Sequence, residues 1–144
     1  APLEPLIGET WRGTFDVNGA AVTDVSRYEW AMNKQAIRNI HTLEGGAYGG
    51  ETLIWASGDS LQFIYVTSGG FTTSGTGYID ETGALIVEEA VEGHAEIDRV
   101  RSTSRLNDDG TLVAVSEMRR NGAWAPRRRA VAPQRAASMK GECF

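Results

Sequence analysis

Cysteine, histidine and long hydrophobic runs are scarce in this 144-residue sequence, and each shortage excludes a class of protein. The single cysteine, Cys143, has no partner within the chain, so an intrachain disulfide is impossible. A structural zinc site needs clustered ligands, whereas the two histidines, His41 and His94, are far apart in the sequence, so no metal site is expected. No apolar run approaches the roughly 20 residues of a membrane-spanning helix, and no membrane span is expected.

Local sequence signatures of common chemistry are also missing. There is no G-x-x-x-x-G-K-[ST] phosphate loop, no dinucleotide fingerprint after a strand and no G-x-S-x-G nucleophile turn. Nucleotide binding and serine hydrolase chemistry are therefore not expected. Heme needs an axial ligand, which His41 or His94 could supply, but His94 follows an expected turn at Glu92-Gly93. Heme is thus a minor option, and otherwise no cofactor is expected.

The net charge of -5 hides an uneven distribution. Residues 1–118 carry 7 basic and 18 acidic side chains, net -11, whereas residues 119–144 carry 7 basic and 1 acidic, net +6. The basic end could hold phosphates, but the acidic body would repel the same polyanion, and no aromatic residue separates the arginines of PRRRAVAPQR. We therefore do not expect nucleic-acid binding, and we expect one folded domain over 1–131 and a basic, flexible tail over 132–144.

The chain does contain a period-two alternation of apolar and polar residues, which is typical of antiparallel β-strands. Turn-forming residues separate the alternating segments, and the connections are too short for parallel crossovers. Such a meander loses its exposed edges by closing into a barrel of about eight to ten strands, which leaves room for one ligand. The expected fold is therefore an all-β barrel. Its strands are expected at 10–17, 26–32, 35–42, 48–56, 61–67, 71–79, 85–91, 95–106, 111–119 and 123–131.

The opening PLEPLIGETWRGTF, residues 2–15, resembles the start of a lipocalin-like, or calycin, barrel. In that superfamily a short N-terminal turn closes the base, and a Gly-x-Trp motif begins the first strand with its Trp packed inside. Here the motif is one residue longer, from Gly8 to Trp11. The later segments, as far as Leu106, are similar to uncharacterised bacterial proteins of lipocalin-like shape. The resemblance implies a cavity for a fatty acid, retinoid or heme, or for isomerase, cyclase or decarboxylase chemistry, and the fold alone does not choose among them.

The register of the second hairpin predicts which side chains face the interior. A two-residue turn at Asn33-Lys34 places Glu29 opposite Arg38 as an ion pair and Trp30 opposite Ile37. The charged pair is expected on the outer face, so the apolar pair marks the inner face. The candidate interior residues on this hairpin are Tyr28, Trp30, Asn39 and His41.

The stretch GGAYGGETLIW, residues 45–55, contains one carboxylate, Glu51. A three-residue turn over 44–46 would place Glu51 opposite Asn39, on the same inner face as His41. A buried carboxylate needs a partner such as His41 or a ligand donor. A one-residue slip in either turn would move Glu51 outside, and this solvent-facing position is the alternative.

Three functions remain open. The first is binding of a small, largely hydrophobic molecule in the barrel. The second is a cofactor-independent isomerase, cyclase or dehydratase with Glu51 and His41 as acid and base. The third is a structural or interaction protein with a filled barrel. A homodimer is compatible with the sequence, and an N-terminal Ala1 followed by Pro2 favours export after signal-peptide removal over a cytoplasmic location.

Other strands add candidate ligand contacts. Leu53 and Trp55 follow Glu51 on the same face, and Tyr65 and Phe71 lie in later segments. Arg101 could point inward and bind a carboxylate ligand through two hydrogen bonds, or it could lie on a solvated outer face. The full candidate set is Tyr28, Trp30, Asn39, His41, Glu51, Leu53, Trp55, Tyr65, Phe71 and Arg101.

Overall fold

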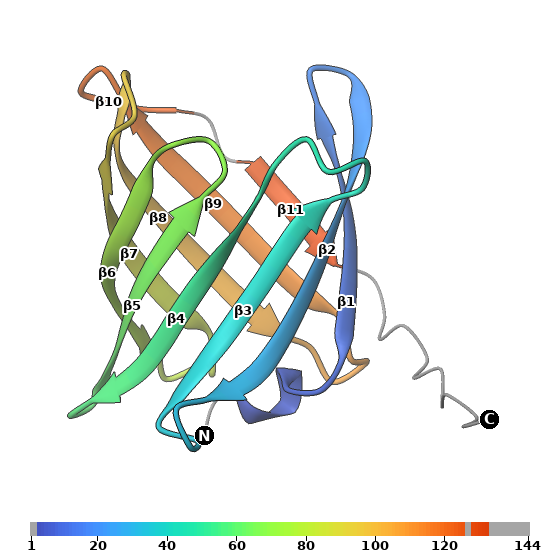
Figure 1. Cartoon of the computed structure of the whole chain (residues 1–144), viewed down its shortest axis with the longest axis vertical. Helices are drawn as coiled ribbons and strands as arrows, with labels where there is room; N and C mark the ends of the chain where they lie inside the picture. The colour runs from blue at the N-terminus through green and yellow to red at the C-terminus, as the bar shows by residue number, and fades with distance from the viewer. Residues whose placement is uncertain (1–2, 126–127, 133–144) are drawn as a thin grey trace.

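A computed structural model describes residues 3–125 and 128–132, and these residues form an antiparallel meander that curls into a barrel (Figure 1). The expected all-β fold is confirmed. A 3-10 turn, η1 (Glu4–Leu6), precedes the strands. The strands are β1 (Thr10–Val17), β2 (Ala20–Ala31), β3 (Ala36–Leu43), β4 (Gly49–Ser57), β5 (Ser60–Thr67), β6 (Thr72–Ile79), β7 (Leu85–Glu92), β8 (Ile97–Leu106), β9 (Leu112–Arg120), β10 (Ala123–Trp124) and β11 (Arg128–Ala132).

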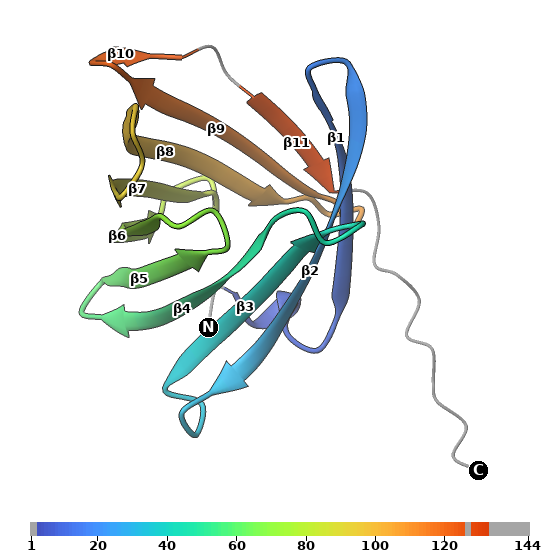
Figure 2. The ribbon, with the colours of Figure 1, turned by 45° about the horizontal axis from the view of Figure 1, so that its top comes forward.

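The strand pairings form a closed ring (Figure 2). Each strand from β1 to β9 pairs with the next one along the chain, and β11 pairs with both β9 and β1. The expected last strand, 123–131, is divided between β10, which pairs with the end of β9, and β11. The predicted tail, 132–144, lies outside the described residues apart from Ala132, which ends β11.

The first hairpin corrects the predicted strand boundaries. β2 begins at Ala20 rather than at Ser26, so residues 20–25 belong to a strand that pairs with β1 along its length. The turn is the dipeptide Asn18-Gly19, whose φ angles are 53° and 83°. Positive φ at both positions is the requirement of the tight hairpin turn that Asn-Gly favours, and it lets the strands continue directly on either side.

The second hairpin has the predicted register. Glu29 opposes Arg38 and Trp30 opposes Ile37. The expected ion pair forms on the outer face, with Nε of Arg38 2.8 Å from Oε1 of Glu29. The register is therefore confirmed, and the Gln35 N–H donates to the Met32 carbonyl oxygen over 3.1 Å, which encloses the expected turn residues Asn33 and Lys34.

The barrel base is closed by the opening segment, at the lower end in Figure 1. Leu3, Leu6, Trp11 and Ile37 pack together as a buried cluster. Trp11 is 3% exposed, and its indole N–H donates a hydrogen bond to the carbonyl oxygen of Leu6 over 3.2 Å. A buried indole needs such an acceptor, so this contact fixes η1 against the first strand and closes the end of the barrel. Within the described part of the chain, no helix is long and apolar enough to cross a membrane.

Candidate functional site: the barrel interior

A cavity of about 580 Å³ lies inside the barrel, which is within the range of small-molecule sites. Because side chains alternate between the two faces of a strand, the strand residues that line it are mostly alternate ones. Most of these side chains are apolar, and several positions carry little or no side chain. The apolar contributors include Phe15, Ile54, Leu61, Phe63, Leu85, Val87, Val91, Val100, Leu112 and Met118, and the small residues include Gly13, Gly77 and Ala114.

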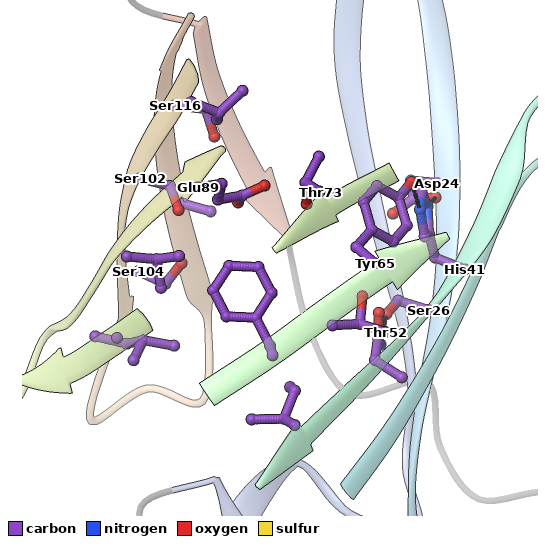
Figure 3. Close-up of a pocket in the computed structure, with 18 of the residues that line it drawn as sticks. Asp24, Ser26, His41, Thr52, Tyr65, Thr73, Glu89, Ser102, Ser104 and Ser116 are labelled. Atoms are coloured by element: carbon purple, nitrogen blue, oxygen red, sulfur yellow. Dashed lines mark hydrogen bonds and ion pairs between the residues drawn. The ribbon is translucent and has the colours of Figure 1, made fainter. Parts of the chain in front are cut away.

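The polar side chains of the cavity include two groups (Figure 3). We call the first the His41 group, which consists of Asp24, His41, Tyr48 and Tyr65. The second is the Glu89 group, which consists of Thr73, Glu89, Ser102 and Ser116. The two groups come from different strands, with β2 to β5 contributing most of the first and β6 to β9 the second.

A chain of hydrogen bonds runs through the His41 group. Nδ1 of His41 is 2.9 Å from Oδ1 of Asp24, and Nε2 of His41 is 2.5 Å from the Tyr65 hydroxyl. That hydroxyl is in turn 3.0 Å from the hydroxyl of Tyr48. An imidazole with its proton on Nδ1 satisfies all of these contacts, because it donates to Asp24 and accepts from Tyr65. The geometry therefore fixes the ring orientation of His41.

Gly50 makes the contact between His41 and Tyr65 possible. It is the β4 residue opposite His41, and the Tyr65 side chain from β5 crosses over it. A Cβ at position 50 would lie 2.4 Å from the Tyr65 ring and 2.5 Å from the carbonyl oxygen of Val66. Any side chain there would collide with the ring. The glycine-rich stretch 45–50 thus shapes the cavity wall at this point.

Tyr65 is a neutral hydrogen-bond donor at physiological pH. Burial raises the pKa of its hydroxyl, and the hydrogen bond with Tyr48 raises it further. The negative charges of Asp24 and Glu89 act in the same direction. The phenol therefore keeps its proton, which it donates to His41.

Aromatic rings form an arc at the end of the barrel opposite η1. Tyr48 stacks on Phe71 with ring centroids 6.4 Å apart, and Phe71 meets His94 edge-on at 5.4 Å. The three rings come from the β3–β4, β5–β6 and β7–β8 connections, which lie at the upper end in Figure 1. His94 is a turn residue, as the sequence predicts, and its Nδ1 accepts backbone N–H bonds from Glu96 and Ile97, both 3.1 Å long.

The Glu89 group holds a carboxyl that faces the cavity. Glu89 is partly exposed, and the space it faces is the barrel interior. Burial raises its pKa, and the nearby Thr73 hydroxyl opposes part of that shift. The directly opposed residue on β6 is Gly75, where a Cβ would lie 1.9 Å from the carbonyl oxygen of Glu88. The close approach of the strands thus requires glycine, which leaves Glu89 without a cross-strand side chain.

Thr73 is buried at 3% exposure and lines the same cavity. Its hydroxyl lies near Glu89 but makes no hydrogen bond of normal geometry with any residue in the described part of the chain. Buried hydroxyls in native proteins are nearly always hydrogen-bonded. The Thr73 hydroxyl is therefore able to form a hydrogen bond with a bound molecule.

Several predicted site residues do face the interior. Tyr28, Asn39, His41, Tyr65 and Phe71 line the cavity. The Asn39 amide is already engaged, because its Nδ2 donates to Ser26 Oγ over 2.6 Å. Burial raises the pKa of Tyr28, so this phenol is also neutral. Trp30 lies deeper and packs against the base cluster rather than lining the cavity.

The expected inward position of Glu51 is wrong. The β3–β4 loop closes through Leu43 N–H and the Tyr48 carbonyl, 2.8 Å apart, so it holds residues 44–47 and is one residue longer than expected. Asn39 consequently opposes Thr52. The one-residue slip turns Glu51 outward, where its side chain is 59% exposed and 4.0 Å from Arg38.

The same one-residue slip places two further predicted site residues, Leu53 and Trp55, on the outer face. A third, Arg101, also lies on the outer face, but on a different strand. Leu53 and Trp55 share the outer face with Glu51 and do not line the cavity. Arg101 points outward from β8, where Nε is 2.5 Å from Oε2 of Glu117 and the guanidinium lies 4.0 Å from the Trp124 ring centroid. Its predicted role in binding a carboxylate inside the barrel therefore has no geometric basis.

Sequence reasoning missed Asp24, Tyr48 and Glu89. A usable signal existed for Glu89, because strict alternation along 85–91 places it on the same face as Leu85, Val87 and Val91. A carboxylate on an otherwise apolar strand face is a recognisable anomaly. Asp24 had no such signal, since its segment was not expected to be a strand. Among the described residues, no group of three or more His, Cys, Asp or Glu side chains is arranged to hold a metal ion.

Neither a protein-family model nor a curated protein matches the chain. Among solved structures, the chain is similar to the crystal structure of Rv2717c from M. tuberculosis, with a TM-score of 0.70 and 16% sequence identity. The match covers 92% of this chain and 94% of that one. At this identity the likeness supports the barrel fold and carries nothing further about the site.

Proposed function

We propose that the protein binds a small, largely apolar molecule inside a lipocalin-like barrel. The observation that carries this proposal is the cavity of about 580 Å³, whose accessible wall is mostly apolar and carries polar side chains at several positions. Binding sites for small molecules have this composition, because apolar contact supplies affinity and a few polar groups fix orientation. Burial of apolar ligand surface contributes roughly 25 cal/mol per Å².

The small side chains on the interior wall argue against a barrel filled by its own side chains. Gly13, Gly77 and Ala114 face the cavity together with Ser102 and Ser104, and such small side chains leave space that large apolar ones would occupy. At the base, by contrast, Trp11 packs with Leu3, Leu6 and Ile37 in a buried cluster. One end of the barrel is therefore a core, and the remainder is suited to a guest.

An enzyme in the same cavity is a second candidate, favoured by the hydrogen bonds from Asp24 through His41 to Tyr65. Such a chain would act through the Tyr65 hydroxyl, because both nitrogens of the His41 ring are engaged. The raised pKa of Tyr65 keeps this hydroxyl protonated at neutral pH, and its proton is donated to His41, which does not suit proton transfer to or from a substrate. Binding is therefore the stronger proposal, and Glu51 has no part in either.

The experiment is to fill the cavity from one wall. Ala114→Phe places a ring on the inner face of β9, whereas Val115→Phe places the same ring on the adjacent outer position. Wild type and Val115→Phe should bind the neutral dye Nile red, and Ala114→Phe should bind it at least about tenfold more weakly while keeping its β-sheet circular dichroism. Equal binding by both variants, or no binding by wild type, would overturn the proposal.

A further inference from the structure

Within residues 3–125, the Asp, Glu, Lys and Arg side chains that face the cavity are all acidic. Asp24 and Glu89 line it, and no Arg or Lys of residues 3–125 does so. A carboxylate ligand would lose its hydration without gaining an Arg or Lys partner from this part of the chain, which is unfavourable. Arg101 lies on the outer face, so a fatty acid would meet only the two acidic groups there.

The two interior carboxyls differ in what they already bind. Asp24 is engaged by the Nδ1 side of the His41 ring. Glu89 forms no ion pair with any side chain of residues 3–125, and Gly75 opposite it contributes no side chain. Of the two carboxyls, Glu89 is therefore the one open to a ligand.

Thr73 is an independent sign of a ligand at this position. Its buried hydroxyl has no hydrogen bond of normal geometry among the described residues, and it lies on the strand beside Glu89. An unsatisfied buried hydroxyl costs roughly 1–3 kcal/mol. Ser102, on the neighbouring strand β8, lines the same cavity and supplies a further oxygen acceptor (Figure 3).

From these three observations we infer that the bound molecule is an apolar amine whose ammonium group lies between the Glu89 carboxylate and the Thr73 hydroxyl; the inference rests on the proposed function. An ammonium has three N–H donors and no acceptor, and every polar atom that it would meet here can accept. It also neutralises the carboxylate. The apolar remainder of the molecule then contacts the surrounding walls.

The test compares ligands that share one chain and differ in their head group. Octylamine, octanol and octanoate compete with Nile red for wild-type protein at neutral pH. Octylamine should displace the dye at concentrations about tenfold or more below octanol, with octanoate weakest. If octanoate or octanol matches octylamine, the inference is overturned while Nile red binding still supports the proposed function. If Nile red does not bind, both proposals fail together.

Paired variants test the location. Glu89→Gln should weaken octylamine binding about tenfold or more, and should weaken it far more than the binding of octanol or Nile red. Glu88→Gln is the matched control, because Glu88 is the adjacent, exposed residue on the outer face of β7. Unchanged octylamine binding by Glu89→Gln, or an equal loss in Glu88→Gln, would overturn the assignment. Should Glu89→Gln fail to fold, Thr73→Val must reduce the preference for octylamine over octanol, and an unchanged preference would overturn it.

Discussion

The Tyr65 ring lies across Gly50, and its hydroxyl is 2.5 Å from Nε2 of His41 two strands away. A side chain at position 50 would separate the two residues. The contact between His41 and Tyr65 therefore depends on the absence of a side chain at Gly50, and this dependence can be measured.

Gly50→Ala should destabilise the protein by about 1–3 kcal/mol, because the new Cβ overlaps both the Tyr65 ring and the Val66 carbonyl. Urea unfolding gives the free energy, and the side-chain nitrogen shifts of His41 report loss of the Tyr65 contact. The control is the same substitution in a Tyr65→Ala background. An equal cost in both backgrounds would show that Gly50 does not accommodate the ring.

Thr73→Val should leave the ligand-free protein as stable as wild type or stabilise it by about 1 kcal/mol, because valine has the shape of threonine without the unsatisfied hydroxyl. Thr76→Val, on the exposed face of the same strand, corrects for the strand preference of valine. Urea unfolding of both variants is the measurement. A loss of more than about 1 kcal/mol in Thr73→Val alone would mean that the hydroxyl has a partner in the folded protein.

The fold could be predicted from the sequence because alternation and turn residues are local signals. The register of β2 and β3 was also predictable, since Glu29 and Arg38 form a recognisable cross-strand pair. The β3–β4 register was not, because the glycine-rich loop has no turn of fixed length and no charged pair flanks it. One extra loop residue then reversed the face of Glu51, Leu53 and Trp55 together.

The candidate site was only partly predictable for a different reason. His41 and Tyr65 were found individually, yet their contact spans β3 to β5 and depends on the space above Gly50. Asp24 joins them from a strand that begins at the Asn18-Gly19 turn. Such juxtapositions arise from barrel curvature and the registers of three pairings, so no single segment encodes them.

Glu51→Gln should change neither stability nor Nile red binding, because the side chain is exposed and its ion pair with Arg38 is long. We expect a difference of less than about 0.5 kcal/mol in urea unfolding. Arg38 keeps its closer partner, Glu29, in this variant. A marked loss of dye affinity would place Glu51 inside the barrel after all and contradict the β3–β4 register.

Glu89→Gln should alter how stability depends on pH. Burial raises the pKa of Glu89 above its ordinary 4.5, so the folded protein holds this proton at pH values where the unfolded chain has lost it. The unfolded state binds fewer protons in that window, and the free energy of unfolding must therefore fall as pH rises from about 4.5 through the folded pKa. Glutamine cannot ionise, so the variant does not lose stability in this pH range for this reason.

The difference in the free energy of unfolding between wild type and Glu89→Gln should consequently be constant below pH about 4. As the pH rises toward neutrality, the difference should shift in favour of the variant. Urea unfolding across a pH series measures the difference, and Glu88→Gln should show no such trend. Saturating octylamine should raise the stability of wild type at neutral pH more than that of Glu89→Gln, because a ligand stabilises the folded state in proportion to its binding free energy. If wild type instead gains stability relative to the variant as pH rises from 4.5, Glu89 is ionised and paired in the ligand-free barrel, and the cavity does not hold a free acceptor.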